Sequence, residues 1–466
     1  MIRALLVLLV LAAVGSGAAW LADHPGEVTI LLPGYRVDTS FAVLVGAAAL
    51  LAFVAGLAVR LWAYMLGALR ISRQARAERR RRRGYRALTQ GLVAVAAGDA
   101  AEARRQARRA ETLLGEPPLT KLLSAQAAQL EGDAEAARTY FAAMLERPDT
   151  AFLGLRGLLT QALRDGEMET AMTLAERAYK LRPATPWVAR TLAELQAHAG
   201  SWQEAARTMH RAARSKAIAT EEGRRKEAAA LFGQSLEADG HGRPAQALAL
   251  MRRAHKLAPA MAPTTARLAR LLAASGQERR AEKLLEKAWA QAPHPDLARA
   301  YGDLRPAEEP LARVRRVERL AERNPEHGES HIALAEAALA ADLWGEARRH
   351  LEAALEARRD GAPSRRAYRL MAEVEESEHG DAVAAGEWLA RATEVEPDDA
   401  WVCERCAAAA SAWVPACPQC DSFDSLVWGS PLKAGFGAIA VSAAPARELR
   451  PAPAAGERAA GGVDAA

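Results

Sequence analysis

The four cysteines of the chain all lie in one twenty-residue stretch near its C-terminal end, WVCERCAAAASAWVPACPQC. They form two C-x-x-C pairs, Cys403/Cys406 and Cys417/Cys420, with ten residues between the pairs. Each pair can make a tight turn that points two sulfurs at one ion, and two such turns complete a tetrahedral four-thiolate site. Structural zinc is the expected ion, and iron would accept the same ligands. Disulfides or a redox C-x-x-C use the same residue types, so the compartment has to decide between these chemistries.

Two apolar segments at the N-terminus predict that compartment. Nineteen uncharged residues separate Arg3 from Asp23, and twenty-one separate Asp38 from Arg60. At about 1.5 Å per helical residue, each segment is long enough to cross a bilayer core. From Arg60 to Arg86 there are ten arginines and one glutamate, so the positive-inside rule assigns this stretch to the cytoplasm. The sequence therefore predicts a two-pass protein of the bacterial inner membrane with both termini cytoplasmic.

A cleaved signal peptide is the alternative for the first apolar segment. It would leave everything after Arg60 in the cytoplasm all the same. In that reducing compartment structural disulfides are disfavoured, and metal binding becomes the leading interpretation of the four thiols. We therefore predict one metal site with four ligands, Cys403, Cys406, Cys417 and Cys420.

The arginine cluster directly follows the second apolar segment, so anionic lipid headgroups are its nearest partner. Each basic residue near such a surface contributes about 1 kcal/mol of attraction. Contact with RNA is the weaker interpretation, because the formal net charge of +5 is smaller than the charge of the cluster alone. We expect no nucleic-acid partner. The predicted membrane-surface residues are Arg70, Arg73, Arg76, Arg79, Arg80, Arg81, Arg82 and Arg83.

The region from about residue 85 to residue 398 repeats a simple pattern. A glycine is followed five, nine and twelve residues later by small or apolar side chains, and its commonest spacing is 34 residues. A glycine between two helices at this period is typical of tetratricopeptide repeats. The glycines of the pattern are Gly98, Gly132, Gly166, Gly200, Gly242, Gly276 and Gly380, with Asp342 in the place of an eighth.

Alanines at the offsets of five and twelve allow helices to approach closely, while the side chain at nine fills the groove between them. The sequence therefore predicts an all-α solenoid of eight clear repeats and one weak repeat, whose second helix is PLARVRRVERLAERNP. A generic alanine-rich bundle, the alternative, would show no fixed period. Before Gly242 the spacing grows to 42 residues, which predicts longer helices or a longer loop there.

The predicted domain order follows from these features. The cysteine module begins four residues after Pro397, so we expect it to cap the last repeat, with aromatic residues around the ion. The order is transmembrane helix 1–22, short periplasmic connector 23–39, transmembrane helix 40–65, basic juxtamembrane helix 66–84, solenoid 85–398, metal ribbon 399–432 and disordered tail 433–466.

Catalytic motifs are absent from the sequence: it has no G-x-x-x-x-G-K-[ST], G-x-G-x-x-G, H-E-x-x-H or G-x-S-x-G pattern, and we expect no enzyme. His327 and His331 are four residues apart, which we interpret as ordinary surface or helix-start positions. A haem-binding interpretation of the Cys417-Pro418 dipeptide leaves the other thiols unexplained.

The combination of elements resembles a known family. Two apolar segments around the connector HPGEVTILLPGYRVDTS, a basic helix and tetratricopeptide repeats resemble the HemY family of proteobacterial inner-membrane proteins, which is associated with late haem biosynthesis. The C-terminal WVCERC, CPQC and LVWGSP segments are similar to the ribbon of alphaproteobacterial members. The resemblance implies a non-enzymatic scaffold that binds cytoplasmic or membrane proteins, haem-pathway enzymes among them.

Two alternatives come from other classes. The lipopolysaccharide assembly protein B group resembles this chain in joining an anchor, repeats and a rubredoxin-like ribbon. Its members are adaptors that control lipid A synthesis through a membrane protease, but they have a single span. A rubredoxin-like electron-transfer protein would use the same four cysteines with iron, and the chain offers no redox partner domain for it.

Overall fold

The computed structural model describes residues 2–23, 26–32, 35–115, 118–356 and 364–431. These residues belong to two compact units, Met1–Met144 and Leu145–Ala466. The tail that we expect to be disordered lies outside the described residues.

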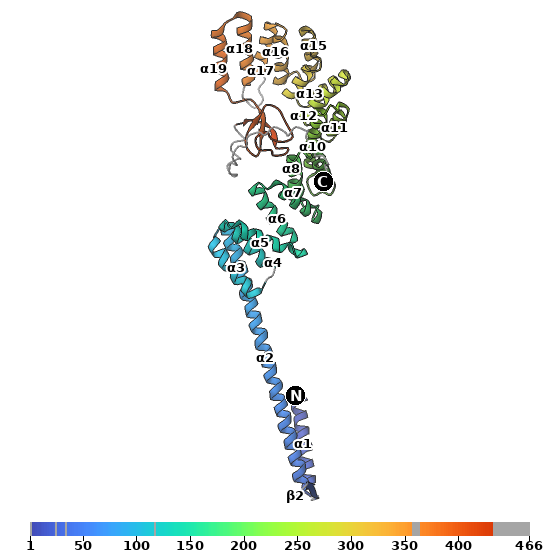
Figure 1. Ribbon diagram of the computed structural model, residues 1–466, viewed down its shortest axis with the longest axis vertical. Helices are drawn as coiled ribbons and strands as arrows, with labels where there is room; N and C mark the ends of the chain where they lie inside the picture. Colours follow the sequence, from blue (N-terminus) through green and yellow to red (C-terminus); the bar gives the residue numbers. More distant parts are fainter. Residues whose placement is uncertain (1, 24–25, 33–34, 116–117, 357–363, 432–466) are drawn as a thin grey trace, which may run out of the picture. The chain divides into compact units, whose positions relative to one another are not determined.

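The first unit begins with two apolar helices joined by a β-hairpin. Helix α1 (Ile2–Asp23) leads into strands β1 (Glu27–Leu32) and β2 (Tyr35–Ser40), and α2 (Phe41–Ala97) follows directly. The strands are antiparallel, with Glu27 opposite Ser40 and Leu32 opposite Tyr35. Figure 1 shows α1 lying beside the first part of α2, with the hairpin at their common end. The short connector that the sequence predicts at 23–39 therefore contains a β-hairpin.

Helix α2 is continuous over 57 residues. Its segment Phe41–Met65 has a mean hydropathy of 2.6 and is long and apolar enough to cross a membrane. Among the described residues this is the one helix that meets the criterion, whereas the sequence predicts two membrane-spanning segments. The helix runs on through the arginine cluster and ends before Gly98, the turn of the first repeat. The predicted transmembrane, juxtamembrane and first repeat segments therefore share a single rod.

The rest of the first unit packs on the end of that rod. Helices α3 (Ala100–Leu114), α4 (Pro118–Glu131) and α5 (Ala134–Met144) follow. Leu88 of α2, Ala107 and Ala110 of α3 and Leu123 of α4 share one buried cluster. At Gly91 a Cβ atom would lie 2.5 Å from the Leu123 side chain, so only glycine lets α4 come this close.

The second unit continues the same helix pairs and confirms an all-helical, tetratricopeptide-like solenoid. Its helices are α6 (Pro148–Asp165), α7 (Met168–Leu181), α8 (Pro186–His198), α9 (Trp202–Arg214), α10 (Thr220–Gly240), α11 (Pro244–Leu257), α12 (Ala262–Ala274), α13 (Glu278–Gln291), α14 (Pro295–Gly302), α15 (Pro310–Ala321), α16 (Gly328–Leu339), α17 (Trp344–Glu356), α18 (Arg365–His379) and α19 (Ala382–Glu394).

The turns between paired helices confirm the repeat alignment. All seven glycines of the pattern have φ between 65° and 79°, and Asp342, in the eighth position, has φ of 57°. This left-handed conformation favours glycine, and aspartate is among the few other residues that tolerate it. A fixed period of such turns excludes a generic bundle.

Burial at the predicted offsets follows the same pattern. Ala171, Ala175 and Ala178 of α7 are all fully buried, as the close approach of the next helix requires. In the last repeat Leu389 is 49% exposed at the offset of nine, because no further helix pair follows α19 among the described residues to cover it.

The irregular repeats also behave as predicted. Helix α10 has 21 residues, so the 42-residue spacing before Gly242 lengthens a helix. The weak repeat is built from α14, which has only 8 residues, and α15, which is the second helix that the sequence predicts.

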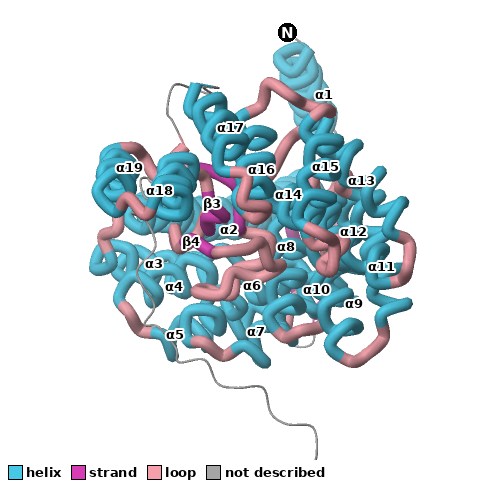
Figure 2. The backbone as a smooth tube through the Cα atoms, turned by 90° about the horizontal axis from the view of Figure 1, so that it is seen from above, coloured by secondary structure: helices cyan, strands magenta, loops and turns pink. Residues whose placement is uncertain are grey.

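The cysteine module forms a three-stranded antiparallel sheet in the order β4-β3-β5, from β3 (Ala400–Cys403), β4 (Ala409–Ala410) and β5 (Leu426–Gly429). The prediction that it caps the last repeat is wrong. After α19 the chain turns back, and Asp398 accepts hydrogen bonds from the backbone N–H groups of Arg365 and Arg366 at the start of α18. The module then packs among the helices before α15. Figure 2 shows the helices of this unit curving around β3 and β4.

Candidate metal centre and its seat in the solenoid

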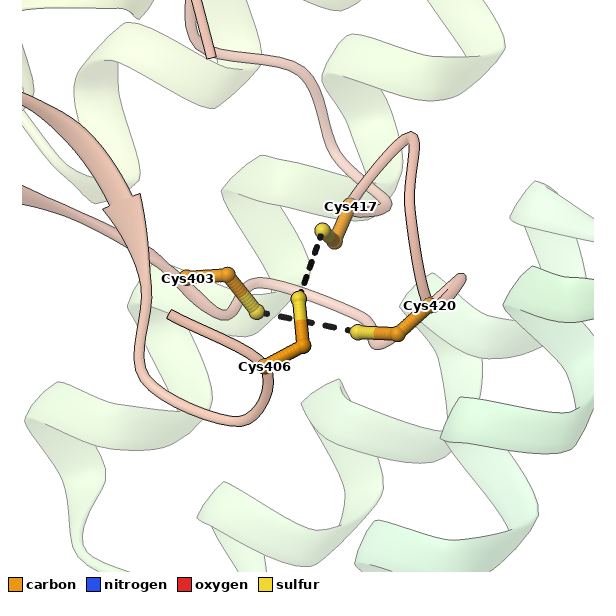
Figure 3. A group of neighbouring side chains, drawn as sticks. All are labelled: Cys403, Cys406, Cys417 and Cys420. Carbon is orange, nitrogen blue, oxygen red and sulfur yellow. Dashed lines mark hydrogen bonds between the residues drawn. The ribbon is translucent and has the colours of Figure 1, made fainter. Parts of the chain in front are cut away.

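The four cysteine sulfurs converge on one point (Figure 3). All four lie within 4.8 Å of one another, and the Cys403–Cys420 and Cys406–Cys417 sulfurs are each 3.7 Å apart. None of the four is in a disulfide. A tetrahedral ion with metal–sulfur bonds of about 2.3 Å needs sulfurs about 3.8 Å apart. Two sulfur–sulfur distances match this value, so the residue types and spacing of the cluster fit one zinc-sized or iron-sized ion.

Two equivalent backbone turns present these sulfurs. The Cys403 N–H donates to the Ala408 carbonyl and the Cys417 N–H to the Ser422 carbonyl, both at 3.0 Å. The residue after the second cysteine of each turn has positive φ, 58° at Ala407 and 53° at Asp421. The two C-x-x-C pairs thus fold as matching knuckles, as their identical spacing predicts.

The thiols are electrostatically prepared for a cation. Burial raises the pKa of Cys403, but a hydrogen bond with Ser425 and nearby backbone N–H groups outweigh it and lower that pKa to about 7. Burial raises the pKa of Cys406 and of Cys420, because little solvent reaches these sulfurs. Adjacent thiolates repel one another, and a bound divalent ion supplies the charge that stabilises them together.

Aromatic side chains of the ribbon anchor it to the start of α14. The indole N–H of Trp401 donates to Asp296 at 2.9 Å. The His294 ring lies against both Trp401 and Trp428, with centroid distances of 5.4 and 4.4 Å. Burial lowers the pKa of His294, so the ring is held neutral between the two indoles.

Two further aromatic contacts reach α9 and α10. Trp413 packs edge-on against Phe232 with centroids 5.0 Å apart, and Phe423 lies 6.4 Å from Trp202. Beside them Gly233 is required, because a Cβ there would lie 2.5 Å from the Trp202 ring. The aromatic residues that we expect to enclose the ion thus pack outward onto the solenoid.

Ion pairs also hold the ribbon against α8 and α10. The Asp424 carboxylate is 3% exposed and lies 3.3 Å from Arg225 and 3.9 Å from Lys226 of α10. Burial raises the pKa of Asp424, while these two cations oppose the shift. On α8, Glu194 accepts a hydrogen bond from Arg405 at 2.8 Å. Helices that are far apart in sequence, α8, α10 and α14, therefore meet on one small ribbon.

The arginine cluster lies along α2, where several members already have protein partners. Arg80 donates to the carbonyl of Leu113 at 3.1 Å and to that of Thr112, at the end of α3. Arg82 pairs with Glu78 at 3.0 Å. Arg81 lies 5.7 Å from the Tyr85 ring. Arg80 thus ties α2 to the end of α3, while Arg81 and Arg82 make exposed contacts within α2.

The two histidines of the sequence analysis are not brought into a metal site. Nδ1 of His327 accepts the Glu329 N–H at the start of α16. His331 stacks on His350 with centroids 5.6 Å apart. Within the described residues, the four cysteines are the one cluster with at least three metal-ligating groups. The solenoid residues that seat the ribbon carry no local signal that could have revealed them.

Comparison with known proteins identifies the family. The model of the HemY protein N-terminus matches residues 26–132, and a tetratricopeptide-repeat model matches residues 240–304. A curated protein of Magnetospirillum gryphiswaldense, "Probable magnetosome protein Mms48", is 30% identical over 460 residues, covering 93% of this chain and 95% of its own. The chain belongs to the HemY family. The first model covers the hairpin, α2 and the first repeat, which is part of the region on which the resemblance rests.

Solved structures are more distant. A tetratricopeptide repeat protein from Parabacteroides merdae is 15% identical, covers 52% of this chain and 92% of its own, and has a TM-score of 0.28. MamA from Desulfovibrio magneticus RS-1 is 14% identical over 36% of this chain and 93% of its own, with a TM-score of 0.24.

Proposed function

We propose that this protein is a membrane-anchored scaffold that binds other proteins through its repeats at a fixed distance from the inner membrane. The observation that carries this is the unbroken α2 helix, which joins the apolar segment Phe41–Met65 to the first repeat. From Met65 to Tyr85 a straight helix rises about 30 Å. The repeats would therefore stand clear of the headgroups but within reach of membrane-bound partners.

In this proposal α1 and Phe41–Met65 both cross the membrane, with the β-hairpin outside and both termini in the cytoplasm. The side-by-side arrangement of α1 and α2 within the first unit supports it (Figure 1), as does the arginine cluster beyond the second helix. Reporter fusions after Gly34 and after Gly98 should give opposite readings. Equal readings at both points would overturn the two-pass topology.

Anionic lipids would contact only the near part of the basic helix. Along the bilayer normal, Arg70, Arg73 and Arg76 lie about 8 to 17 Å beyond Met65, whereas Arg79 to Arg83 lie about 21 to 27 Å beyond it. Screening reduces attraction over about 8 Å at physiological salt. We therefore assign lipid binding mainly to Arg70, Arg73 and Arg76, and helix support mainly to Arg80, Arg81 and Arg82.

Cys403, Cys406, Cys417 and Cys420 would hold one structural zinc ion. Its chemistry is to cross-link the two knuckles, so that the ribbon keeps its shape against α8, α10 and α14. Metal analysis of the purified protein should find about one zinc per chain. Iron with rubredoxin-like absorption would instead support electron transfer.

The clients that the family suggests are enzymes of haem or porphyrin synthesis at the inner membrane. The name of the Magnetospirillum relative supports a second candidate, a scaffold of a specialised membrane compartment. Proximity labelling from the repeats in native cells separates the two. Labelled haem-pathway enzymes support the first candidate, and compartment proteins without those enzymes support the second. Labelling of the lipid A control machinery would favour the adaptor alternative.

A further inference from the structure

A cavity of about 310 Å³ opens in the second unit between α14, α15 and α16. It lies in the weak repeat, where α14 has only 8 residues while α12 and α16 have 13 and 12. The short helix leaves space that a full-length first helix would occupy. The uncharged lining residues are small or aliphatic: Ala298, Gly302, Pro306, Val317, Leu320, Ala333, Ala337 and Ala340.

Three of the four charged lining residues already have partners. Arg299 binds Asp296 at 2.7 Å, and Asp303 accepts from Arg270 at 3.2 Å. Glu336 accepts from Arg366 of α18 at 2.8 Å. These pairs neutralise the rim of the cavity on both sides.

Arg313 of α15 is different. Within the described residues its side chain forms no hydrogen bond or ion pair, and its Nε atom is buried without a partner. A buried polar group without a partner is unfavourable, and a guanidinium demands an anion most strongly. Arg313 is only partly buried, so the cavity offers one guanidinium whose Nε lacks a protein partner, set between small apolar walls and a rim of ion pairs.

We propose that this pocket binds an acidic side chain of a partner polypeptide, with small apolar residues on either side of it. The planar guanidinium of Arg313 matches a carboxylate, which it can bind through two hydrogen bonds. Asp303 and Glu336 are paired with Arg270 and Arg366, so the rim adds little net charge and the single charge of a carboxylate matches Arg313 better than the double charge of a phosphate. The alanine-lined walls leave room for main chain and small side chains, but not for large ones.

This inference rests on the proposed scaffold function and names one of its binding sites. The ribbon also shapes the pocket, since Asp296 binds both Arg299 of the lining and Trp401 of the ribbon. A client held here would contact α15 and α16, together with α14, which both the ribbon and the pocket share. Metal loss should therefore weaken client binding without touching Arg313.

The test uses the full chain in lipid nanodiscs and a random heptapeptide library displayed on phage. We expect the wild-type protein to enrich peptides with one Asp or Glu flanked by Ala, Gly or Val. The best enriched peptide, labelled with fluorescein, should bind at least 10-fold more weakly to Arg313→Ala, as loss of a charged hydrogen-bond partner requires. Its Asn or Gln version should lose as much on the wild-type protein.

Arg315→Ala is the matched control, because Arg315 is an exposed residue of the same helix. It should leave peptide binding unchanged. Enrichment without acidic residues, or equal binding to wild type and Arg313→Ala, would overturn the pocket assignment. Proximity labelling of membrane-associated clients that survives in Arg313→Ala would leave the scaffold function standing while the pocket fails. If the wild-type protein neither labelled clients nor enriched any peptide, the proposed scaffold function would be rejected.

Discussion

The middle and the end of the second unit are both built from helix pairs, but only the middle is covered by the ribbon. In the middle, the ribbon covers α8, α10 and α14 with aromatic rings and a buried carboxylate from residues far along the chain. At the end, α19 leaves Val383 and Leu389 exposed, at 76% and 49%, and no helix pair of the part of the chain that the structure describes packs against them. The middle thus depends on long-range contacts with the ribbon, which the proposed metal would hold in shape, while the end depends on its neighbouring helices.

This difference shows how a repeat protein can gain a rigid segment. Each pair in a solenoid contacts mainly its neighbours, so stability is a sum of local terms. A ribbon that bridges α8, α10 and α14 couples pairs that would otherwise loosen independently. We expect the coupled segment to behave as one cooperative unit.

Metal loss should produce the largest effect. Replacing Cys403 by Ser should remove most of the bound metal and unfold the ribbon, since structural zinc contributes on the order of 10 kcal/mol to such modules. Hydrogen exchange should then rise in α8, α10 and α14. Exchange in α18 and α19 should stay as in the wild type. A rise at α19 with none at α10 would restore the cap interpretation.

Removing one aromatic side chain tests how the ribbon is held against the solenoid helices and leaves the four cysteines unchanged. Trp413 is 4% exposed and packs on Phe232, so Trp413→Ala should cost about 3 to 5 kcal/mol in the coupled segment. Urea denaturation, followed by backbone hydrogen exchange in α10, measures this loss of stability. Metal content should remain close to one per chain. Trp388→Ala, in the last repeat, is the control and should leave α10 unaffected.

Overpacking a repeat should have a smaller and local effect. Ala281 is fully buried, so Ala281→Leu should force α12 and α13 apart and cost about 1 to 3 kcal/mol. The exposed Ala390 of α19 offers the matched change, because Ala390→Leu adds the same atoms in open space. Equal thermal stability of the two variants would contradict the repeat alignment.

Acidification should weaken the seat modestly. Burial lowers the pKa of His294, so the folded protein holds this ring neutral, although Asp296 nearby opposes the shift. Its contribution is complete above the ordinary histidine pKa of about 6.5 and is lost as pH falls below it. Tryptophan fluorescence between pH 7 and pH 5 should show the loss. In His294→Gln this part of the pH dependence should disappear.

Changing the open end should have the smallest effect. Leu389→Gln alters a side chain that no later pair covers, so the free energy of unfolding should change by less than about 0.5 kcal/mol. Leu285→Gln is the comparison, since Leu285 occupies the same offset in an earlier repeat and is fully buried. A large decrease in the free energy of unfolding of Leu389→Gln would show that another surface covers α19.

The repeat region could be read from the sequence because its rules are local. A left-handed turn at Gly276 and a buried alanine at Ala281 depend on residues within one helix pair, and the 34-residue period exposes them. The convergence of the four cysteines could also be predicted from the sequence, because each C-x-x-C turn forms its own backbone hydrogen bonds. The connector carried a weaker signal: Pro33-Gly34 between two apolar runs is typical of a hairpin turn, but the sequence analysis assigned this stretch no secondary structure.

The place of the ribbon was decided by tertiary structure alone. Nothing near Asp424 in the sequence points to Arg225, which lies 199 residues away, or relates Trp401 to Asp296, 105 residues away. These contacts depend on the curvature that many helix pairs accumulate, and a sequence period does not specify that curvature. The amino-acid sequence by itself determined an apolar N-terminal region, a helical repeat and a cluster of four cysteines. Only the folded chain brought that module onto α8, α10 and α14, because there its aromatic rings find more buried surface than the exposed last helix offers.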